Sequence, residues 1–167
     1  IPAHPKPVIA EVAGTATAAG CQLVASCDLA YAAEGAHFAT PGVHIGLFCS
    51  TPMVALSRNV AAKHAMEMLL TGDPCTAPRA AEIGLLNEAV PADELTGRVM
   101  AVAAKIAAKS TATVAYGKPA FYQQAEMTLA DAYQHAAAVM VENMLARDAE
   151  EGIAAFIEKR APVWSDS

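Results

Sequence analysis

The sequence predicts an α/β fold followed by a long set of helices. Two observations predict it. Near the N-terminus, short apolar runs alternate with glycine-containing turns, whereas from about Pro52 onward apolar residues recur at helical spacing. The resulting order of strand, loop, helix and strand is typical of an α/β layer. With 167 residues, 54% of them hydrophobic and 17% charged, the chain can bury a sizeable core.

The first elements follow from apolar runs separated by small residues. The run before Val12 predicts a buried strand, and the small residues after it predict a loop. A short helix follows and ends near Asp28, and two further strands come next. The predicted bounds are 7–12 for the strand, 14–19 for the loop, 20–26 for the helix, and 29–33 and 37–40 for the later strands.

The next elements are defined by their ends. Pro52 can open a helix, and Gly72 can close a second helix whose apolar face includes Leu69. Thr76 can cap a third helix through residue 83, and residues 85–90 predict a short strand.

The C-terminal part predicts long amphipathic helices. Asp93 can cap one with Leu95, Val99, Val102 and Ile106 on a single face. A similar stripe comprises Leu129, Tyr133, Ala136, Met140 and Met144, and residues 148–159 predict a final helix. The preceding α/β part is too small to cover all these faces, so we expect a missing N-terminal part or other subunits to cover them.

Composition and charge exclude several classes of function. The net charge is −6 and no basic stripe is present, so we expect no nucleic-acid partner. The apolar runs are too short for a membrane span, so we expect no membrane insertion. Four cysteines without a signal sequence favour a reducing cytoplasm. Because no CxxC pair is present, we expect no zinc site, and the cysteines fit better as small buried side chains. No signal peptide pattern is present, and Ile1 indicates that the start of the gene product is not in view.

The loop at 13–22 is the candidate for chemistry. A predicted strand runs through small residues into a helix, and the first amides of a helix have no partner within it. They also lie at the positive end of the helix dipole, which suits a developing oxyanion. The same pattern is equally that of a tight packing corner. The loop lacks the glycine patterns of dinucleotide-binding and phosphate-binding loops, and it lacks the G-x-S-x-G of a nucleophile elbow.

Several motifs, taken in order, resemble the crotonase (enoyl-CoA hydratase/isomerase) superfamily. They cover essentially the whole chain. They are PVIAEVAG at 7–14, AAGCQL at 18–23, CDLA at 27–30, FATP at 38–41, GL at 46–47, AMEMLLTG at 65–72, AEIGLL at 81–86 and EGIAAFIEKR at 151–160.

The resemblance implies a ββα spiral core truncated at its N-terminus. Residues 1–92 would be its C-terminal part, and residues 93–167 a helical oligomerisation region of a homotrimer or homohexamer. It also implies a fatty acyl-CoA thioester substrate, whose oxygen is held between two backbone amides as an enolate forms. The second amide maps to Ala19, and the first lies in an earlier segment that is absent here. No separate cofactor is implied, because coenzyme A is part of the substrate. The expected location is the bacterial cytoplasm, or the mitochondrial matrix in a eukaryote.

The departures from the family pattern affect the reaction. The two glutamates that hydratases of the family use map to Gln22 and Gly42, neither of which can take a proton at neutral pH. His44 is a substitute base if residues 42–44 are extended, and a surface or packed histidine otherwise. Ala18 and Ala19 stand where glycines are common, so a positive φ there would strain an alanine.

The resemblance also singles out Phe156 and Lys159, whose counterparts reach the coenzyme A of a neighbouring subunit. A spacing of three places them on one helical face. The alternative is an ordinary amphipathic end of the chain. Three hypotheses follow for the protein: an enoyl-CoA hydratase or isomerase, a catalytically silent acyl-CoA-binding or regulatory subunit, and a structural partner in mixed trimers.

Overall fold

The structure is a computed structural model that describes residues 1–165. It divides into two compact units. The first contains Val8–Val102 with Ile1, and the second contains Pro2–Pro7 and the chain from Ala103 onward. The division falls inside helix α5 (Leu95–Ala107).

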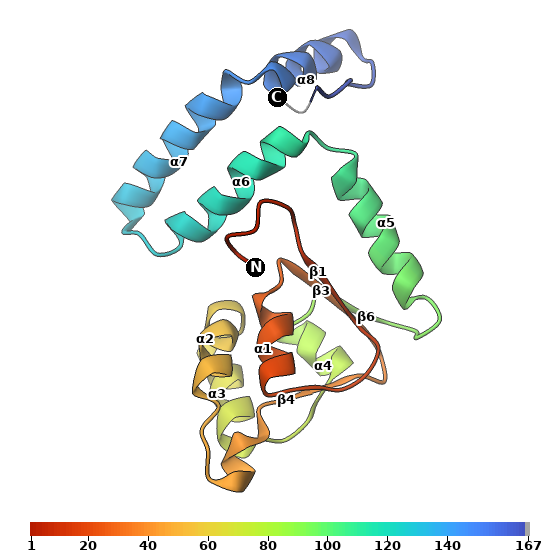
Figure 1. The fold of residues 1–167 in the computed structure, drawn as a ribbon, viewed down its shortest axis with the longest axis vertical. Helices are drawn as coiled ribbons and strands as arrows, with labels where there is room; N and C mark the ends of the chain where they lie inside the picture. Colours follow the sequence, from red (N-terminus) through yellow and green to blue (C-terminus); the bar gives the residue numbers. More distant parts are fainter. Residues whose placement is uncertain (166–167) are drawn as a thin grey trace. The chain divides into compact units, whose positions relative to one another are not determined.

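The first unit is built on two small sheets (Figure 1). In one sheet, β3 lies between β1 and β6 and is parallel to both. In the other, β4 lies between β2, which is parallel to it, and β5, which is antiparallel. The bounds are β1 Ile9–Val12, β2 Ala16–Thr17, β3 Leu29–Ala33, β4 His37–Ala39, β5 Cys75–Thr76 and β6 Glu88–Val90. The strand β2 therefore lies within the predicted loop at 14–19.

The helices of the first unit confirm two of the predicted end signals, whereas the helix expected to open at Pro52 begins two residues earlier, at Ser50. The Thr76 side chain accepts a hydrogen bond from the Arg79 amide and so caps α4, and Gly72 ends α3 in the left-handed conformation. The bounds are α1 Ala19–Ser26, η1 Pro41–Ile45, α2 Ser50–Asn59, α3 Ala62–Thr71 and α4 Ala77–Glu82. The segment η1 is a 3-10 helix, which the sequence analysis did not predict.

Two apolar clusters hold the first unit together. The larger one packs α1, α2 and α3 around β4, with Cys21, Phe38 and Leu56 fully buried. The smaller one packs the start of α5 against β3 and β6 through Tyr31 and Val99. Each buried aliphatic or aromatic side chain stabilises the fold by about 1.5–3 kcal/mol. These clusters fix the position of the strand-to-helix turn that precedes α1.

The second unit contains three helices: α6 Thr111–Gln124, α7 Leu129–Met144 and α8 Arg147–Glu158. The sequence analysis did not predict α6, which Ser110 caps by accepting from the Thr113 amide at 3.1 Å. After α8 the chain folds back, and the Trp164 indole N–H donates to the Ala108 carbonyl at 2.9 Å.

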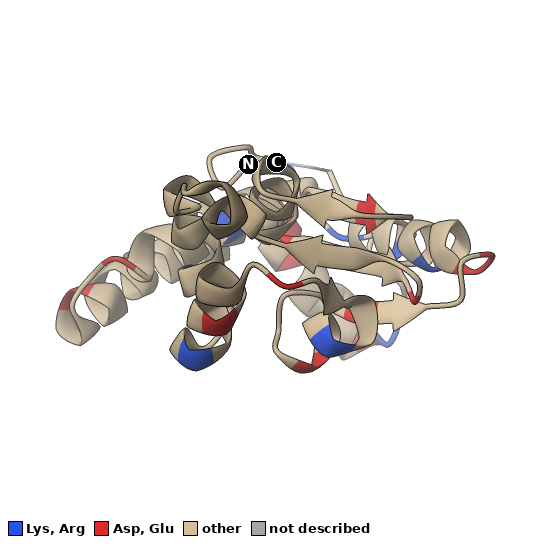
Figure 2. Ribbon diagram, turned by 90° about the horizontal axis from the view of Figure 1, so that it is seen from below, with Lys and Arg blue, Asp and Glu red and all other residues tan. Residues whose placement is uncertain are grey.

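The predicted apolar stripe of α7 is exposed to solvent. Leu129 and Tyr133 are 76% and 73% exposed, and Met140 and Met144 are also exposed. Burying such a stripe requires atoms that the described chain does not provide. No helix within residues 1–165 is both long enough and apolar enough to span a lipid bilayer. Figure 2 shows acidic and basic positions dispersed along the ribbon of the described residues.

Candidate functional site

The turn into α1 holds a strained residue. Ala18 is the N-cap of α1, with φ 48° and ψ −112°, a conformation that costs an alanine about 1–3 kcal/mol. Two hydrogen bonds hold it there. The Ala18 amide donates to the Ala39 carbonyl at 2.9 Å, and the Ala18 carbonyl accepts from the Gln22 amide at 3.0 Å. The strain foreseen for this alanine pair is therefore present at Ala18.

The amide of Ala19, the first residue of α1, is available to a ligand. Ala19 is exposed, and its N–H makes no hydrogen bond to any other part of residues 1–165. Because the N–H groups of a first helical turn point away from the helix at its positive end, they attract an anionic oxygen. The amide is therefore neither paired internally nor packed in the core.

Gln22 lies one turn further along α1 and is half-buried. Its spacing of three from Ala19 places the two residues on neighbouring positions of the helix surface. A glutamine at this point can donate and accept hydrogen bonds, but it does not exchange a proton at neutral pH. The side chain can thus orient a water molecule or a carbonyl group without acting as an acid or a base.

Gly42 lies in η1, where the chain turns back on itself. The Leu47 amide donates to the Gly42 carbonyl at 2.9 Å and closes the turn. A Cβ atom on Gly42 would lie 2.6 Å from the Leu47 carbonyl oxygen and 2.9 Å from the Cys49 Sγ. Neither the Leu47 carbonyl nor the Cys49 thiol was predicted at this position from the sequence, because the close approach depends on the folded turn.

The geometry assumed for His44 is wrong. Residues 42–44 are not extended, because Pro41–Ile45 is a 3-10 helix with about three residues per turn. Residues two apart therefore lie roughly 240° apart around the axis and do not share a face. The His44 ring instead lies against Gly72, where a Cβ would come within 2.6 Å of the His44 Nε2.

The cysteines of the first unit have the properties of core residues. Burial, followed by the nearby thiols of Cys75 and Cys49, raises the pKa of Cys21 to about 12. Burial likewise raises the pKa of Cys75. Both thiols are therefore neutral at physiological pH and poor nucleophiles. Across the described part of the chain, no three His, Cys, Asp or Glu residues are grouped to bind a metal ion.

The helical face assumed for Phe156 and Lys159 also needs correction. Phe156 is on α8 and is 84% exposed. Lys159 lies beyond the end of α8 in the left-handed conformation, with φ 57°. Its direction is therefore set by the chain reversal and not by helical periodicity. Both residues belong to the second unit.

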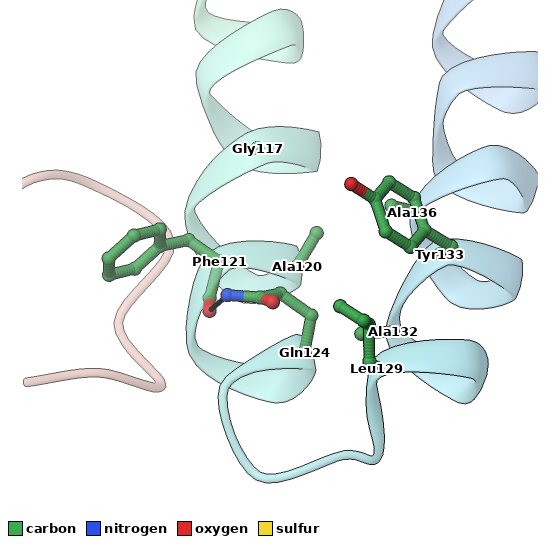
Figure 3. A pocket seen from close by; sticks show the side chains of 8 residues that line it. All are labelled: Gly117, Ala120, Phe121, Gln124, Leu129, Ala132, Tyr133 and Ala136. Carbon is green, nitrogen blue, oxygen red and sulfur yellow. Dashed lines mark hydrogen bonds between the residues drawn. The ribbon is translucent and has the colours of Figure 1, made fainter.

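An apolar pocket of about 450 Å³ lies between α6 and α7 (Figure 3). Figure 3 shows Tyr133 and Leu129 on α7 facing the small residues of α6. The Gln124 side chain is held on α6, since its Nε2 donates to the Phe121 carbonyl at 3.1 Å. The lining residues are Gly117, Ala120, Phe121, Gln124, Leu129, Ala132, Tyr133 and Ala136. Tyr133 is the only titratable residue in this lining. The pocket can therefore contact an apolar group, but it provides little acid–base chemistry.

A smaller polar pocket of about 190 Å³ lies beside α3 and α4. Its charged side chains interact with one another. Arg79 donates to Glu82 at 2.9 Å, and its second nitrogen lies 3.3 Å from His64 Nδ1. The charge of Arg79 in this pocket is thus compensated by Glu82.

The profile of the family described as "Enoyl-CoA hydratase/isomerase" matches residues 1–167. Human "Enoyl-CoA hydratase domain-containing protein 3, mitochondrial" is 54% identical over 162 residues, which are 97% of this chain and 54% of that protein. The "Probable enoyl-CoA hydratase, mitochondrial" of Dictyostelium discoideum is 37% identical over 161 residues, covering 95% and 58%. The chain thus spans about half the length of the curated relatives it matches.

Two crystal structures have the same fold. Human enoyl-CoA hydratase domain-containing protein 3 superposes with a TM-score of 0.95 at 54% identity, covering 98% of this chain and 65% of that one. An enoyl-CoA hydratase of Mycobacterium smegmatis superposes with a TM-score of 0.94 at 52% identity, covering 96% and 62%.

Proposed function

Since the chain belongs to the enoyl-CoA hydratase/isomerase family, we propose that the protein binds a fatty acyl-CoA thioester and stabilises the enolate formed from it. The predicted crotonase-like α/β fold is confirmed by the crystal structures that match it. The observation that carries the proposal is the unpaired, exposed amide of Ala19 at the start of α1.

The proposed role of Ala19 is that of one of two oxyanion donors. As a base removes an α-proton or a nucleophile adds, negative charge develops on the thioester oxygen, and an N–H at a helix start stabilises it. The strained N-cap at Ala18 fixes the direction of this amide in advance, so little reorganisation is needed during the reaction. The second donor is proposed to come from a segment that precedes Ile1.

Gln22 and Gly42 decide between two versions of the proposal. In the first, the protein is an enzyme of the hydratase or isomerase type, with Gln22 facing the substrate. In the second, it is a catalytically silent acyl-CoA-binding or regulatory subunit. The lack of a carboxylate at both positions favours the second version for hydration, because adding water across a double bond requires both an acid and a base.

The proposed assembly is a homotrimer or homohexamer. The exposed stripe of α7 supports it, because contact with other subunits would remove this apolar surface from water. Phe156 and Lys159 are proposed to contact the coenzyme A of a neighbouring subunit, where a ring and an ammonium group suit an adenine and a phosphate. The human and rat relatives are named as mitochondrial proteins, and for a eukaryotic source we propose the mitochondrial matrix. The cytoplasm is the corresponding proposal for a bacterium.

The experiment uses the full-length protein. Hydration of crotonyl-CoA is followed by thioester absorbance, and binding of acetoacetyl-CoA is measured by calorimetry. Turnover supports the enzyme, and binding without turnover supports the silent subunit. If acetoacetyl-CoA does not bind, both versions are wrong. Gel filtration of the protein alone tests the remaining hypothesis of a partner in mixed trimers, which predicts no complete homo-oligomer.

A further inference from the structure

The turn between η1 and α2 is closed tightly around Gly42. Gly46 takes the left-handed conformation with φ 77°, and the Leu47 amide donates to the Gly42 carbonyl. The chain then returns over Gly42, which brings the Leu47 carbonyl within 2.6 Å of the position of a Cβ on Gly42. Real Cβ atoms do not approach a backbone oxygen so closely, and backbone held by hydrogen bonds moves at a cost.

The thiol of Cys49 closes the same space from the other side. Its Sγ lies 2.9 Å from that Cβ position, and Cys49 packs against the main apolar cluster. Cys49 is also the N-cap of α2, whose Met53 amide donates to the Cys49 carbonyl at 2.9 Å. The thiol is therefore attached to a hydrogen-bonded backbone segment, and only rotation about its single χ1 torsion can move it away from this position.

The residues that flank Gly42 also contact α3 and the glycine that ends it. The ring of His44 packs against Gly72, and the buried Thr40 hydroxyl donates to the Met68 carbonyl at 2.8 Å. Residues on both sides of Gly42 are thus attached to α3, which limits how far η1 can retreat to make room.

We infer that the Leu47 carbonyl and the Cys49 thiol together set the reaction specificity of this site, by filling the space that any side chain at position 42 would need. The inference rests on the proposed function, in which position 42 takes the place of the second glutamate of the family's hydratases. The site therefore lacks a second carboxylate and also cannot accept one unless the turn from Gly42 to Cys49 opens. Hydration through a pair of carboxylates is excluded by this packing.

The first test measures thermal unfolding of the full-length protein with Gly42→Ala, Cys49→Gly and both changes. Gly42→Ala should lower the midpoint by roughly 2–6 °C. The fall should be smaller when Cys49 is already glycine, because one of the two close contacts is then gone. The matched control is Gly14→Ala, since a Cβ at Gly14 meets nothing within 4 Å. An unchanged midpoint for Gly42→Ala, or an equal fall in both backgrounds, would overturn the inference.

The second test supplies the missing carboxylates. Gln22→Glu with Gly42→Glu should hydrate crotonyl-CoA no faster than the unmodified protein. Adding Cys49→Gly to this pair removes one of the two close contacts and leaves the Leu47 carbonyl in place. The rate should therefore rise by only about tenfold, below the 10²–10⁴-fold that a fully positioned acid or base contributes. Equal hydration rates for the double variant and for the triple variant with Cys49→Gly would show that the Cys49 thiol does not exclude the second carboxylate. If the unmodified protein does not bind acetoacetyl-CoA, the proposed function fails, whereas the unfolding midpoints still decide whether Leu47 and Cys49 fill this space.

Discussion

The amide of Ala18 donates to the carbonyl of Ala39 at 2.9 Å, and this contact ties the start of α1 to the end of β4. It keeps Ala18 at a positive φ, which an alanine adopts only under constraint. Ala18→Gly should therefore stabilise the protein by about 1 kcal/mol. The free energy gained by relieving the backbone strain at residue 18 is larger than the conformational-entropy penalty of ordering a glycine on folding. Chemical denaturation of the full-length protein measures this change.

The control for this variant is Ala104→Gly, at an exposed position inside α5. Here the same substitution relieves no strain and should destabilise the protein by about 0.5–1 kcal/mol. Equal losses of stability at the two positions would show that Ala18 is not strained in solution.

Removing the Ala19 amide tests its proposed role directly. Ala19→Pro deletes the N–H at the first helical position, where proline is tolerated because this group has no partner in the helix. Any turnover should fall by about 10²–10³-fold, the effect of losing one oxyanion donor. Acetoacetyl-CoA should also bind about tenfold more weakly.

Ala62→Pro provides the matched control, since Ala62 is the exposed first residue of α3. This variant should retain binding and turnover. Thermal unfolding of both variants identifies any general loss of fold. Unchanged acetoacetyl-CoA affinity in a folded Ala19→Pro protein would contradict the role of the amide.

Acid stability should depend on Glu151. Its hydrogen bonds from Arg160, and then from the Val163 amide, lower its pKa from the ordinary 4.5 to about 2. A carboxyl group with a lowered pKa in the folded state contributes stability above pH 4.5, which is lost as the pH falls toward 2. Glu151→Gln should therefore reduce the dependence of the unfolding midpoint on pH in this window. Glu142→Gln on α7 makes the same charge change as a control, and an identical pH profile for the two variants would contradict the assignment.

The sequence predicted those elements whose signals are local. Gly72 at the end of α3 and Thr76 at the start of α4 are end signals that the structure confirms. The helix α6 was missed because its polar and small residues form no clear apolar stripe and Pro119 lies inside it. Its start at Ser110 could have been found from the capping position alone.

The candidate site was only partly predictable, for a related reason. Ala18 and Ala19 follow from a strand-to-helix pattern, so their strain and exposure could be anticipated. The space around Gly42 could not, because it depends on a turn that brings Leu47 back across five positions. His44 was misplaced for the same reason, since a short 3-10 helix has no periodic signature in the sequence.

The buried hydroxyl of Thr40 should be required for the position of η1. It donates to the Met68 carbonyl at 2.8 Å, and Thr40→Val keeps the shape of the side chain while removing this bond. The Met68 carbonyl retains the bond from the Gly72 amide, so we expect a loss of only about 1 kcal/mol in the free energy of unfolding. Thr71→Val removes an exposed hydroxyl that donates to the Glu67 carbonyl at 2.9 Å and accepts from the Asp73 amide at 3.2 Å. Because these bonds are exposed to water, their loss should cost less than about 0.5 kcal/mol. Urea denaturation compares the free energies of unfolding of the two variants. An equal loss for both would mean that the buried Thr40 hydrogen bond contributes no more stability than an exposed one.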